Sequence, residues 1–212
     1  MTQEYPGRFI VIEGIDGSGK STQIRLLCEA LAKKNQDPLA TFEPTNGPIG
    51  TLIRKMLGGD LPVDQRTIAS LFAADRTDHL VNPKTGIRKA MDEGRVVICD
   101  RYYFSSYAYH AQYIDMDWVI QANAVNADIL TPDATLFIDV DPQVCLSRIQ
   151  SRKGPLEIYE KIDIMKAVRA NYFKAFEKLK DRETVIVIDG NASFDTVAER
   201  IWEKAAPLVF KE

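Results

Sequence analysis

The sequence has few cysteines, and their placement excludes two kinds of cross-link. Only three occur among 212 residues, Cys28, Cys99 and Cys145, and they lie far apart in apolar stretches. This arrangement shows neither a disulfide framework nor the close spacing of a metal site. We therefore expect a protein of a reducing compartment, long enough to bury one sizeable core.

The chain also lacks an excess of basic residues and any long apolar run. Its 27 Lys and Arg stand against 30 Asp and Glu, a formal net charge of -3 that is unlike a dedicated nucleic-acid-binding domain. The opening residues MTQEYPGR contain no apolar signal region, and no apolar run reaches the about 20 residues of a transmembrane helix. We expect a cytoplasmic protein with no nucleic-acid or membrane partner.

Repeats, low-complexity tracts and linkers rich in Pro, Gly and Ser are absent too, so we expect one domain over residues 1–212. Short apolar runs alternate instead with stretches of helical period. Because the runs are continuously apolar, both sheet faces should be covered, as for parallel strands between helices. The pattern predicts an α/β fold, a doubly wound, five-stranded parallel sheet flanked by helices. The predicted strands are 9–13, 38–43, 95–100, 134–140 and 184–189.

The first predicted strand leads into a glycine-rich turn with a specific pattern. Residues 14–21 read GIDGSGKS and match G-x-x-x-x-G-K-[ST], with a buried strand before them and a helix from Gly19 to about Lys34 after them. Glycines allow successive backbone N–H groups to surround phosphate oxygens at a helix N-terminus. We expect this phosphate-binding loop (P-loop) to bind ATP through Gly14, Ile15, Asp16, Gly17, Ser18, Gly19, Lys20, Ser21 and Thr22. Lys20 should reach the β and γ phosphates, and the Ser21 hydroxyl should ligate Mg²⁺.

Motors, switches and kinases share such a loop, so the acceptor of the phosphoryl group must be read elsewhere. No guanine-reading Asn-Lys-x-Asp sequence occurs, which disfavours a GTPase. The predicted strand 95–100 ends in a single carboxylate and a cation, Asp100 and Arg101, which indicates a second anion near the reaction centre. A nucleoside monophosphate supplies a largely dianionic phosphate, with a second pKa of about 6, and so needs cations rather than a general base.

Three cations lie at a charged break between two predicted helices, in the segment 148–157. They are Arg148, Arg152 and Lys153. Each taken alone is also compatible with a solvated surface charge.

Four stretches together resemble the thymidylate kinases, which phosphorylate dTMP to dTDP with ATP. They are EGIDGSGKST (13–22), FEPTNGPIG (42–50), LFAADRTDH (71–79) and DRYYFSSYAY (100–109). The combination of DRYxxSxxAY with FxxxR is far more specific than the P-loop alone. Adenylate and guanylate kinases share the loop but not these two patterns in this order.

The resemblance implies how the acceptor nucleotide binds. Phe72 stacks on thymine, and Arg76, one helical turn away, donates to a base carbonyl. Ser105 and Ser106 line the base edge and the acceptor site, and Tyr109 lies against the deoxyribose. An isolated Phe72 would more commonly be a core residue of an amphipathic helix.

The resemblance also implies how the phosphates are held. Asp16 approaches the sugar 3′-hydroxyl, Arg101 binds the acceptor phosphate, and Asp100 organises Mg²⁺, partly through water. Glu43 follows Phe42 where bacterial members often carry arginine, and we expect it to contact a magnesium-bound water or an arginine. Family members are typically homodimers packed through helices, which the apolar segment 68–74 permits.

The same resemblance predicts a short lid over residues 148–157. Some members carry a catalytic arginine at the loop position that Gly17 occupies, and others supply it from the lid. We therefore expect Arg152 to stabilise the transferring phosphoryl group, with Lys20, Asp16 and Arg101 completing the catalytic set and with Arg148 and Lys153 binding ATP.

Two other functions remain open from sequence. A deoxynucleoside kinase would phosphorylate a sugar hydroxyl and would need a carboxylate base, for which Glu43 or Asp16 is a candidate. A nucleotide-sensing regulator would bind through the loop without turnover.

Overall fold

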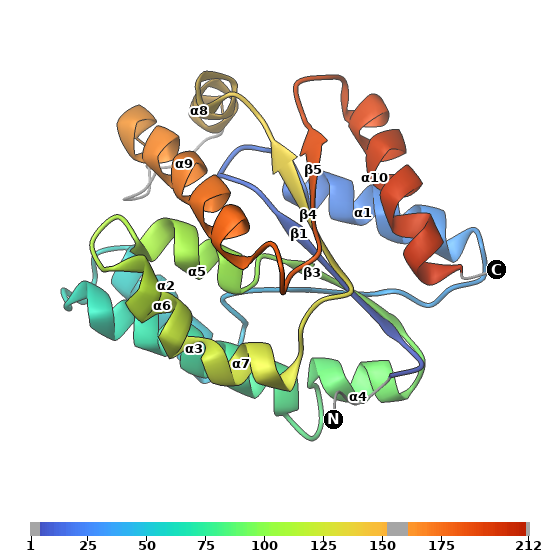
Figure 1. Cartoon of the computed structure of the whole chain (residues 1–212), viewed down its shortest axis with the longest axis horizontal. Coiled ribbons are helices and arrows are strands. Elements are labelled where there is room, and N and C mark those ends of the chain that lie inside the picture. Colours follow the sequence, from blue (N-terminus) through green and yellow to red (C-terminus); the bar gives the residue numbers. More distant parts are fainter. Residues whose placement is uncertain (1–4, 152–160, 211–212) are drawn as a thin grey trace.

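A five-stranded parallel sheet forms the centre of the molecule (Figure 1). The computed structural model describes residues 5–151 and 161–210. The strands lie in the order β2-β3-β1-β4-β5, so the chain crosses from one half of the sheet to the other after β3. Their bounds are β1 (Arg8–Glu13), β2 (Leu39–Phe42), β3 (Val96–Asp100), β4 (Ala134–Asp139) and β5 (Val185–Asp189). All five predicted strands are confirmed.

Burial explains why the strands read as continuous apolar runs. In the central strand β1, Phe9 pairs with Val97 of β3 and Ile10 pairs with Ala134 of β4, and all four side chains are buried. Such a strand contacts helices on both faces, so it has no polar alternation. The predicted doubly wound fold is confirmed.

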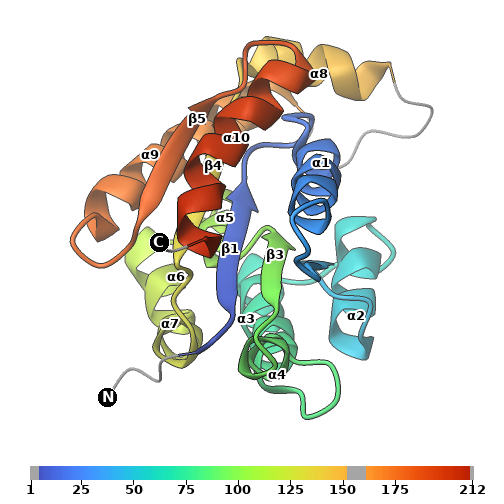
Figure 2. The ribbon, with the colours of Figure 1, turned by 90° about the vertical axis from the view of Figure 1, so that its right-hand side faces the viewer.

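Helices cover both faces of this sheet. Helices α1 and α10 pack together on one face, on the near side in Figure 2, and α3, α5 and α9 lie on the other. The helices are α1 (Lys20–Ala32), α2 (Pro48–Leu57), α3 (Gln65–Val81), α4 (Ile87–Asp92), α5 (Tyr103–His110), α6 (Met116–Ala122), α7 (Ala124–Ile129), α8 (Pro142–Gln150), α9 (Ile162–Leu179) and α10 (Phe194–Val209). None of these described helices is both long and apolar enough to cross a membrane.

The helix expected from Gly19 to about Lys34 corresponds to α1, and the stretches of helical period between the second and third predicted strands correspond to α2, α3 and α4. Helix α5 gave no separate periodic signal. All eight of its residues are buried, so it lacks the polar face that marks an amphipathic helix.

A buried carboxylate at the end of β1 holds α5 in place. Glu13 Oε1 accepts from the backbone N–H groups of Tyr102 (2.9 Å) and Ser105 (3.0 Å), at the start of this helix. Its Oε2 accepts from the Ser105 hydroxyl (2.7 Å) and from the Tyr172 hydroxyl of α9 (2.8 Å). Burial raises the pKa of Glu13 above its ordinary value, although Arg101 and these hydrogen bonds oppose the shift.

We predict that Glu13→Gln and Glu13→Leu differ sharply in stability. The Gln carbonyl still accepts from both N–H groups, and the hydroxyls of Ser105 and Tyr172 can rotate. Glu13→Gln should therefore lower the free energy of unfolding by less than about 1 kcal/mol. The Leu variant leaves buried N–H groups unpaired and should cost about 3 kcal/mol. Urea unfolding measures both values, and equal costs would contradict the role of Glu13.

The same pair tests the raised pKa of Glu13. Because the folded state disfavours its ionisation, the wild type should lose stability relative to Glu13→Gln as pH rises above about 4.3, the value of an unfolded Glu. The loss should stop once the pH exceeds the folded-state pKa. A constant difference between pH 4 and 8 would contradict the shift.

Candidate active site

The P-loop lies at the carboxyl end of β1, where parallel sheets commonly bind ligands. Gly14, Gly17 and Gly19 have φ values of 155°, 80° and 96°, which a side chain would disfavour. Lys20 is buried, and its Nζ donates to the carbonyl oxygens of Gly14 (3.0 Å) and Ile15 (3.3 Å). Burial and the charge of Arg101 lower the pKa of Lys20. The loop therefore has the backbone shape and the cation that a polyphosphate requires.

Gly17 is restricted by its surroundings as well as by its φ. A Cβ built there would lie 2.5 Å from the carbonyl oxygen of Cys145 in α8. The Arg148 guanidinium, from the same helix, donates to the Gly17 carbonyl at 3.3 Å. Helix α8 thus closes over the loop at this point, which gives a structural reason for the missing loop arginine.

Two oxygen groups fit a magnesium ion beside the loop. The Ser21 hydroxyl donates to Asp100 Oδ2 at 3.2 Å. Asp100 Oδ1 is buried and has no hydrogen-bond partner in the part of the chain that the structure describes. A buried carboxylate oxygen without a partner calls for a ligand, and Mg²⁺ prefers such hard oxygen donors.

Arg101 connects the loop with α5. It has a φ of 69° and follows directly after β3, and its Nη2 contacts Asp16 Oδ1 at 2.5 Å. Its Nη1 donates to the Gly14 carbonyl (3.2 Å) and to the Ser105 hydroxyl (3.0 Å). Tyr109 completes the group, because its hydroxyl donates to Asp16 Oδ2 at 2.8 Å and its ring lies under the guanidinium.

The pKa of Asp16 reflects these partners. Burial alone would raise it, but the charges of Arg101 and Lys20 and the hydrogen bonds from Tyr109 and Arg101 lower it below its ordinary value. Asp16 therefore stays a carboxylate that can accept a further hydrogen bond.

Two cavities meet at the Asp16–Arg101 ion pair. The first has a volume of about 590 Å³, within the range of small-molecule sites, and follows the P-loop to Asp100 and the end of β2. The second is smaller and mostly apolar, with a volume of about 130 Å³. Asp16 and Arg101 line both. Ligands in the two cavities would thus meet at this pair.

Besides Asp16 and Arg101, four more of the predicted acceptor residues line the smaller cavity. They are Phe72, Ser105, Ser106 and Tyr109, together with His110, which sequence reasoning left without a role. The rings of Phe72 and His110 lie 5.1 Å apart. Burial and the charge of Arg76 lower the pKa of His110 to about 3, so its ring is neutral at physiological pH.

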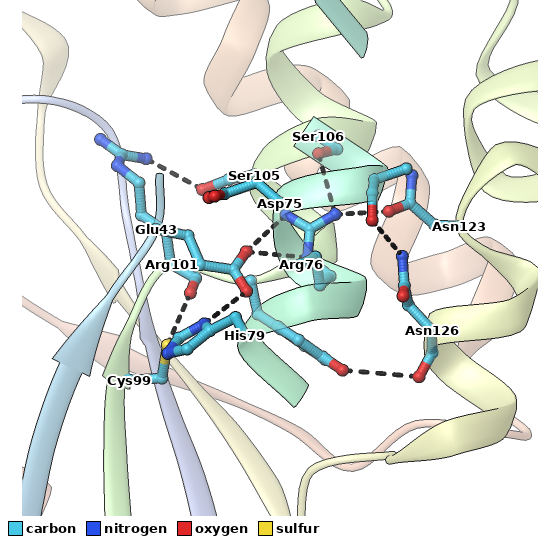
Figure 3. Close-up of polar contacts among 12 residues, drawn as sticks. Glu43, Asp75, Arg76, His79, Cys99, Arg101, Ser105, Ser106, Asn123 and Asn126 are labelled. Carbon is cyan, nitrogen blue, oxygen red and sulfur yellow. Dashed lines mark hydrogen bonds and ion pairs between the residues drawn. The ribbon is translucent and has the colours of Figure 1, made fainter. Parts of the chain in front are cut away.

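Arg76 and Glu43 do not line this cavity, although Glu43 lines the larger one; Figure 3 shows how the two side chains contact each other. Arg76 is 1% exposed, and its Nε and Nη2 contact Glu43 Oε2 at 2.8 and 2.7 Å. The other carboxylate oxygen of Glu43 pairs with His79 Nδ1 at 3.0 Å. The structure thus places Glu43 against an arginine, one of the two contacts expected for it, while the contact between Arg76 and the base stays a prediction.

Asp75, for which the sequence suggested no role, fixes the segment after β2. Its carboxylate accepts from the Thr45 backbone N–H and from the Thr45 hydroxyl, both at 2.7 Å. A single carboxylate on α3 thereby holds the FEPT stretch at the cavity edge. Only the fold brings these two motifs together, 30 residues apart in sequence.

Glu43, His79 and Cys99 form a buried group whose ligand atoms lie within 4.8 Å of one another, close enough to hold a metal ion. Burial, with the carboxylates of Glu43 and Asp100, raises the pKa of the Cys99 thiol well above its usual range. The thiol donates to the Arg101 carbonyl at 3.1 Å. A protonated thiol is a poor metal ligand, so we assign this group to the hydrogen-bond network.

The lid cations are only partly visible. Arg148 lies over the Phe194 ring, 5.4 Å from its centroid, next to the P-loop. Arg152 and Lys153, and most of the predicted lid 148–157, lie outside the described residues. Their roles stay predictions.

Comparisons with known proteins agree with this geometry. A family profile described as thymidylate kinase matches residues 12–201. The chain belongs to the thymidylate kinase family. It is 42% identical over 186 residues to a probable thymidylate kinase of Pyrococcus horikoshii, covering 84% of this chain and 87% of the relative. It is 37% identical to a putative thymidylate kinase of Treponema pallidum (91% and 92% covered) and 36% identical to a probable thymidylate kinase of Methanococcus maripaludis (95% and 98% covered).

Family membership establishes the reaction class expected from the motifs. The chain is an ATP-dependent kinase of nucleotide biosynthesis that phosphorylates dTMP to dTDP. The match spans the P-loop, both cavities and all five strands except the first residues of β1.

We predict that Gly17→Ala weakens ATP binding at least tenfold, because its Cβ would push α8 from the loop. Gly59→Ala is a matched control, since Gly59 has a similar φ of 86° but a Cβ there meets nothing within 4 Å. The free energy of unfolding should fall by about 1 kcal/mol in both variants because of backbone strain. Only Gly17→Ala should change the KM for ATP. Equal KM values would contradict the restriction at Gly17.

Proposed function

We propose that phosphoryl transfer takes place at the Asp16–Arg101 pair, with ATP in the larger cavity and dTMP in the smaller one. The observation that carries this proposal is that these two residues line both cavities. A donor phosphate held by the P-loop and an acceptor phosphate entering beside Phe72 meet at Arg101. One cation at the junction reduces the repulsion between the two anions.

On the donor side, Lys20 and the loop N–H groups bind the β and γ phosphates of ATP. Ser21 and Asp100 would hold Mg²⁺, in part through water, and the bound ion would neutralise charge on the phosphate oxygens. The buried Asp100 Oδ1 that lacks a protein partner supports this assignment.

On the acceptor side, Phe72 stacks on thymine and Tyr109 lies against the deoxyribose. Ser105 and Ser106 line the base edge, and Arg76 donates to a base carbonyl. Arg76 reaches the cavity wall through Ser106, whose hydroxyl accepts from its Nη1 at 3.3 Å.

Asp16 orients the acceptor rather than removing a proton. Its lowered pKa keeps it an anion, so it accepts a hydrogen bond from the sugar 3′-hydroxyl. The phosphate of dTMP is already largely dianionic at neutral pH and attacks without a general base.

The lid 148–157 completes this mechanism. Arg152 stabilises the charge that develops on the transferring phosphoryl group, as an arginine supplied from outside the loop does in other P-loop enzymes. Arg148 and Lys153 bind ATP, and closure of the lid excludes water. The placement of Arg148 over Phe194, beside Gly17, supports its share of this role.

A homodimer is a further expectation from the family. Within the segment 68–74, however, Ile68, Ala69 and Ala73 are buried inside the chain, so these side chains are already used by its own core. Ser70 and Ala74 of the same segment are exposed, so a dimer would use this outward face or other exposed helix surfaces, such as Leu52 of α2.

The activity can be tested by measuring ADP release from Mg·ATP with dTMP, dUMP, dCMP, AMP, GMP or thymidine as acceptor. We expect rapid turnover with dTMP, little with the purine monophosphates and none with thymidine. Turnover with thymidine alone would make the acceptor a hydroxyl and would require Asp16 or Glu43 as base. Tight ATP binding without turnover on any acceptor would favour a nucleotide sensor.

We predict that Phe72→Ala raises the KM for dTMP about tenfold or more, because base stacking on an aromatic ring contributes about 1–3 kcal/mol. The KM for ATP should not change. Phe210→Ala is the control, since Phe210 is exposed at the end of α10 and lines neither cavity. If the KM values for dTMP and ATP rise equally in Phe72→Ala, the ring does not stack on the base.

A further inference from the structure

A continuous chain of hydrogen bonds reaches the acceptor cavity through Ser106, and we call it the Arg76 network; Figure 3 shows its part from His79 to Asn123. It consists of Thr41, His79, Glu43, Arg76 and Asn123, which come from β2, the segment after β2, α3 and the junction of α6 with α7. Glu43, Arg76, His79 and Asn123 are all buried. Sequence reasoning assigned no role to Thr41, His79 or Asn123.

His79 determines how the Glu43 carboxylate is shared. Since a carboxylate only accepts, His79 Nδ1 carries the proton and donates to Glu43 Oε1 at 3.0 Å. His79 Nε2 lies 2.7 Å from the Thr41 hydroxyl, which can donate to it. With Oε1 held by His79, both Arg76 contacts converge on Oε2.

Asn123 holds the other side of the guanidinium. Its Nδ2 donates to the Val119 carbonyl at 2.9 Å, so the amide orientation is fixed and Oδ1 faces Arg76. Arg76 Nη1 donates to this oxygen and to the Ser106 hydroxyl. Both N–H groups of Nη1 are therefore used.

These contacts leave Arg76 with one spare donor. A guanidinium has five N–H groups and no acceptor. Nε uses one, Nη1 uses two and Nη2 uses one on Glu43. The fifth, on Nη2, has no partner among residues 5–151 and 161–210. This N–H can donate to an acceptor that enters beside Ser106, which lines the cavity and accepts from Arg76 Nη1.

We propose that His79 and Asn123 are positioning residues that leave Arg76 a single N–H for the acceptor base. This arrangement selects a pyrimidine with a carbonyl at the position that faces Arg76 and rejects one with an amino group there. The inference rests on the proposed base contact of Arg76 and adds which residues set its selectivity. A base amino group at this position would face the Arg76 N–H, donor against donor. The guanidinium has no acceptor that could bind the amino group.

The test compares His79→Leu with His79→Gln. Leu removes the donor to Glu43, whereas the Gln amide can donate to Glu43 and accept from Thr41 as the imidazole does. Steady-state kinetics with dTMP and dCMP give KM and kcat for each variant. Asp78→Asn, an exposed change at the neighbouring position of α3, is the matched control.

For His79→Leu we expect the KM for dTMP to rise about tenfold and the ratio of kcat/KM for dTMP over dCMP to fall about fivefold. The KM for ATP should stay within about a factor of two. In His79→Gln, the KM for dTMP and the dTMP to dCMP ratio of kcat/KM should both return to within about threefold of the wild-type values. Equal losses in the Leu and Gln variants, or equal weakening of both substrates, would show a merely structural role and overturn the inference.

Thr41→Val gives a second test if His79→Leu does not fold. It removes only the hydroxyl at the outer end of the network, so the dTMP to dCMP ratio should fall about twofold to threefold. An unchanged ratio in this folded variant would also overturn the inference.

Arg76→Met separates this inference from the proposed function. If it leaves the dTMP to dCMP ratio intact, Arg76 does not read the base, and the proposed base contact itself fails. If Arg76→Met removes the preference for dTMP over dCMP while His79→Leu and Thr41→Val leave that preference intact, only the positioning role fails.

Discussion

The ion pair between Arg101 and Asp16 is the contact on which the rest of the site depends. It joins the P-loop after β1 to the residue that follows β3, and Tyr109 of α5 contacts both partners. Arg101 adopts a positive φ, which turns its side chain from the strand end toward the loop. The side chains are only partly exposed, Arg101 by 17% and Asp16 by 32%, so separating them would cost more than breaking a fully exposed surface pair. The loop and α5 are thereby held in one arrangement.

Local patterns in the sequence were sufficient for the sheet and the loop. Each strand is a short apolar run, and the loop motif fixes its own backbone through Gly14, Gly17 and Gly19, so neither depends on distant residues. The Arg76 network could not be found this way. Glu43 and Arg76 are separated by 33 residues and Arg76 and Asn123 by 47, and no spacing rule connects them. The restriction at Gly17 likewise depends on the carbonyl of Cys145, which only the packing of α8 reveals.

Two carboxylates near the site serve the scaffold. Glu13 accepts four hydrogen bonds that fix α5 and α9, and Glu43 divides its oxygens between Arg76 and His79. Each holds a cavity wall in place through groups that it cannot release without leaving buried donors unpaired. The preorganised positions of Ser105 and Arg76 follow from these two residues, although neither carboxylate lines the acceptor cavity.

This use of the acids bears on the chemistry of the acceptor. A sugar hydroxyl would need a carboxylate with a free oxygen and a pKa near neutrality to remove its proton. Glu43 has no free oxygen, and Arg101 and Lys20 hold the pKa of Asp16 below its ordinary value. A phosphate acceptor has the opposite requirement, because it arrives already ionised and needs cations at the point of contact. Arg101 and Lys20 meet that need at the junction where Asp16 and Arg101 line both cavities.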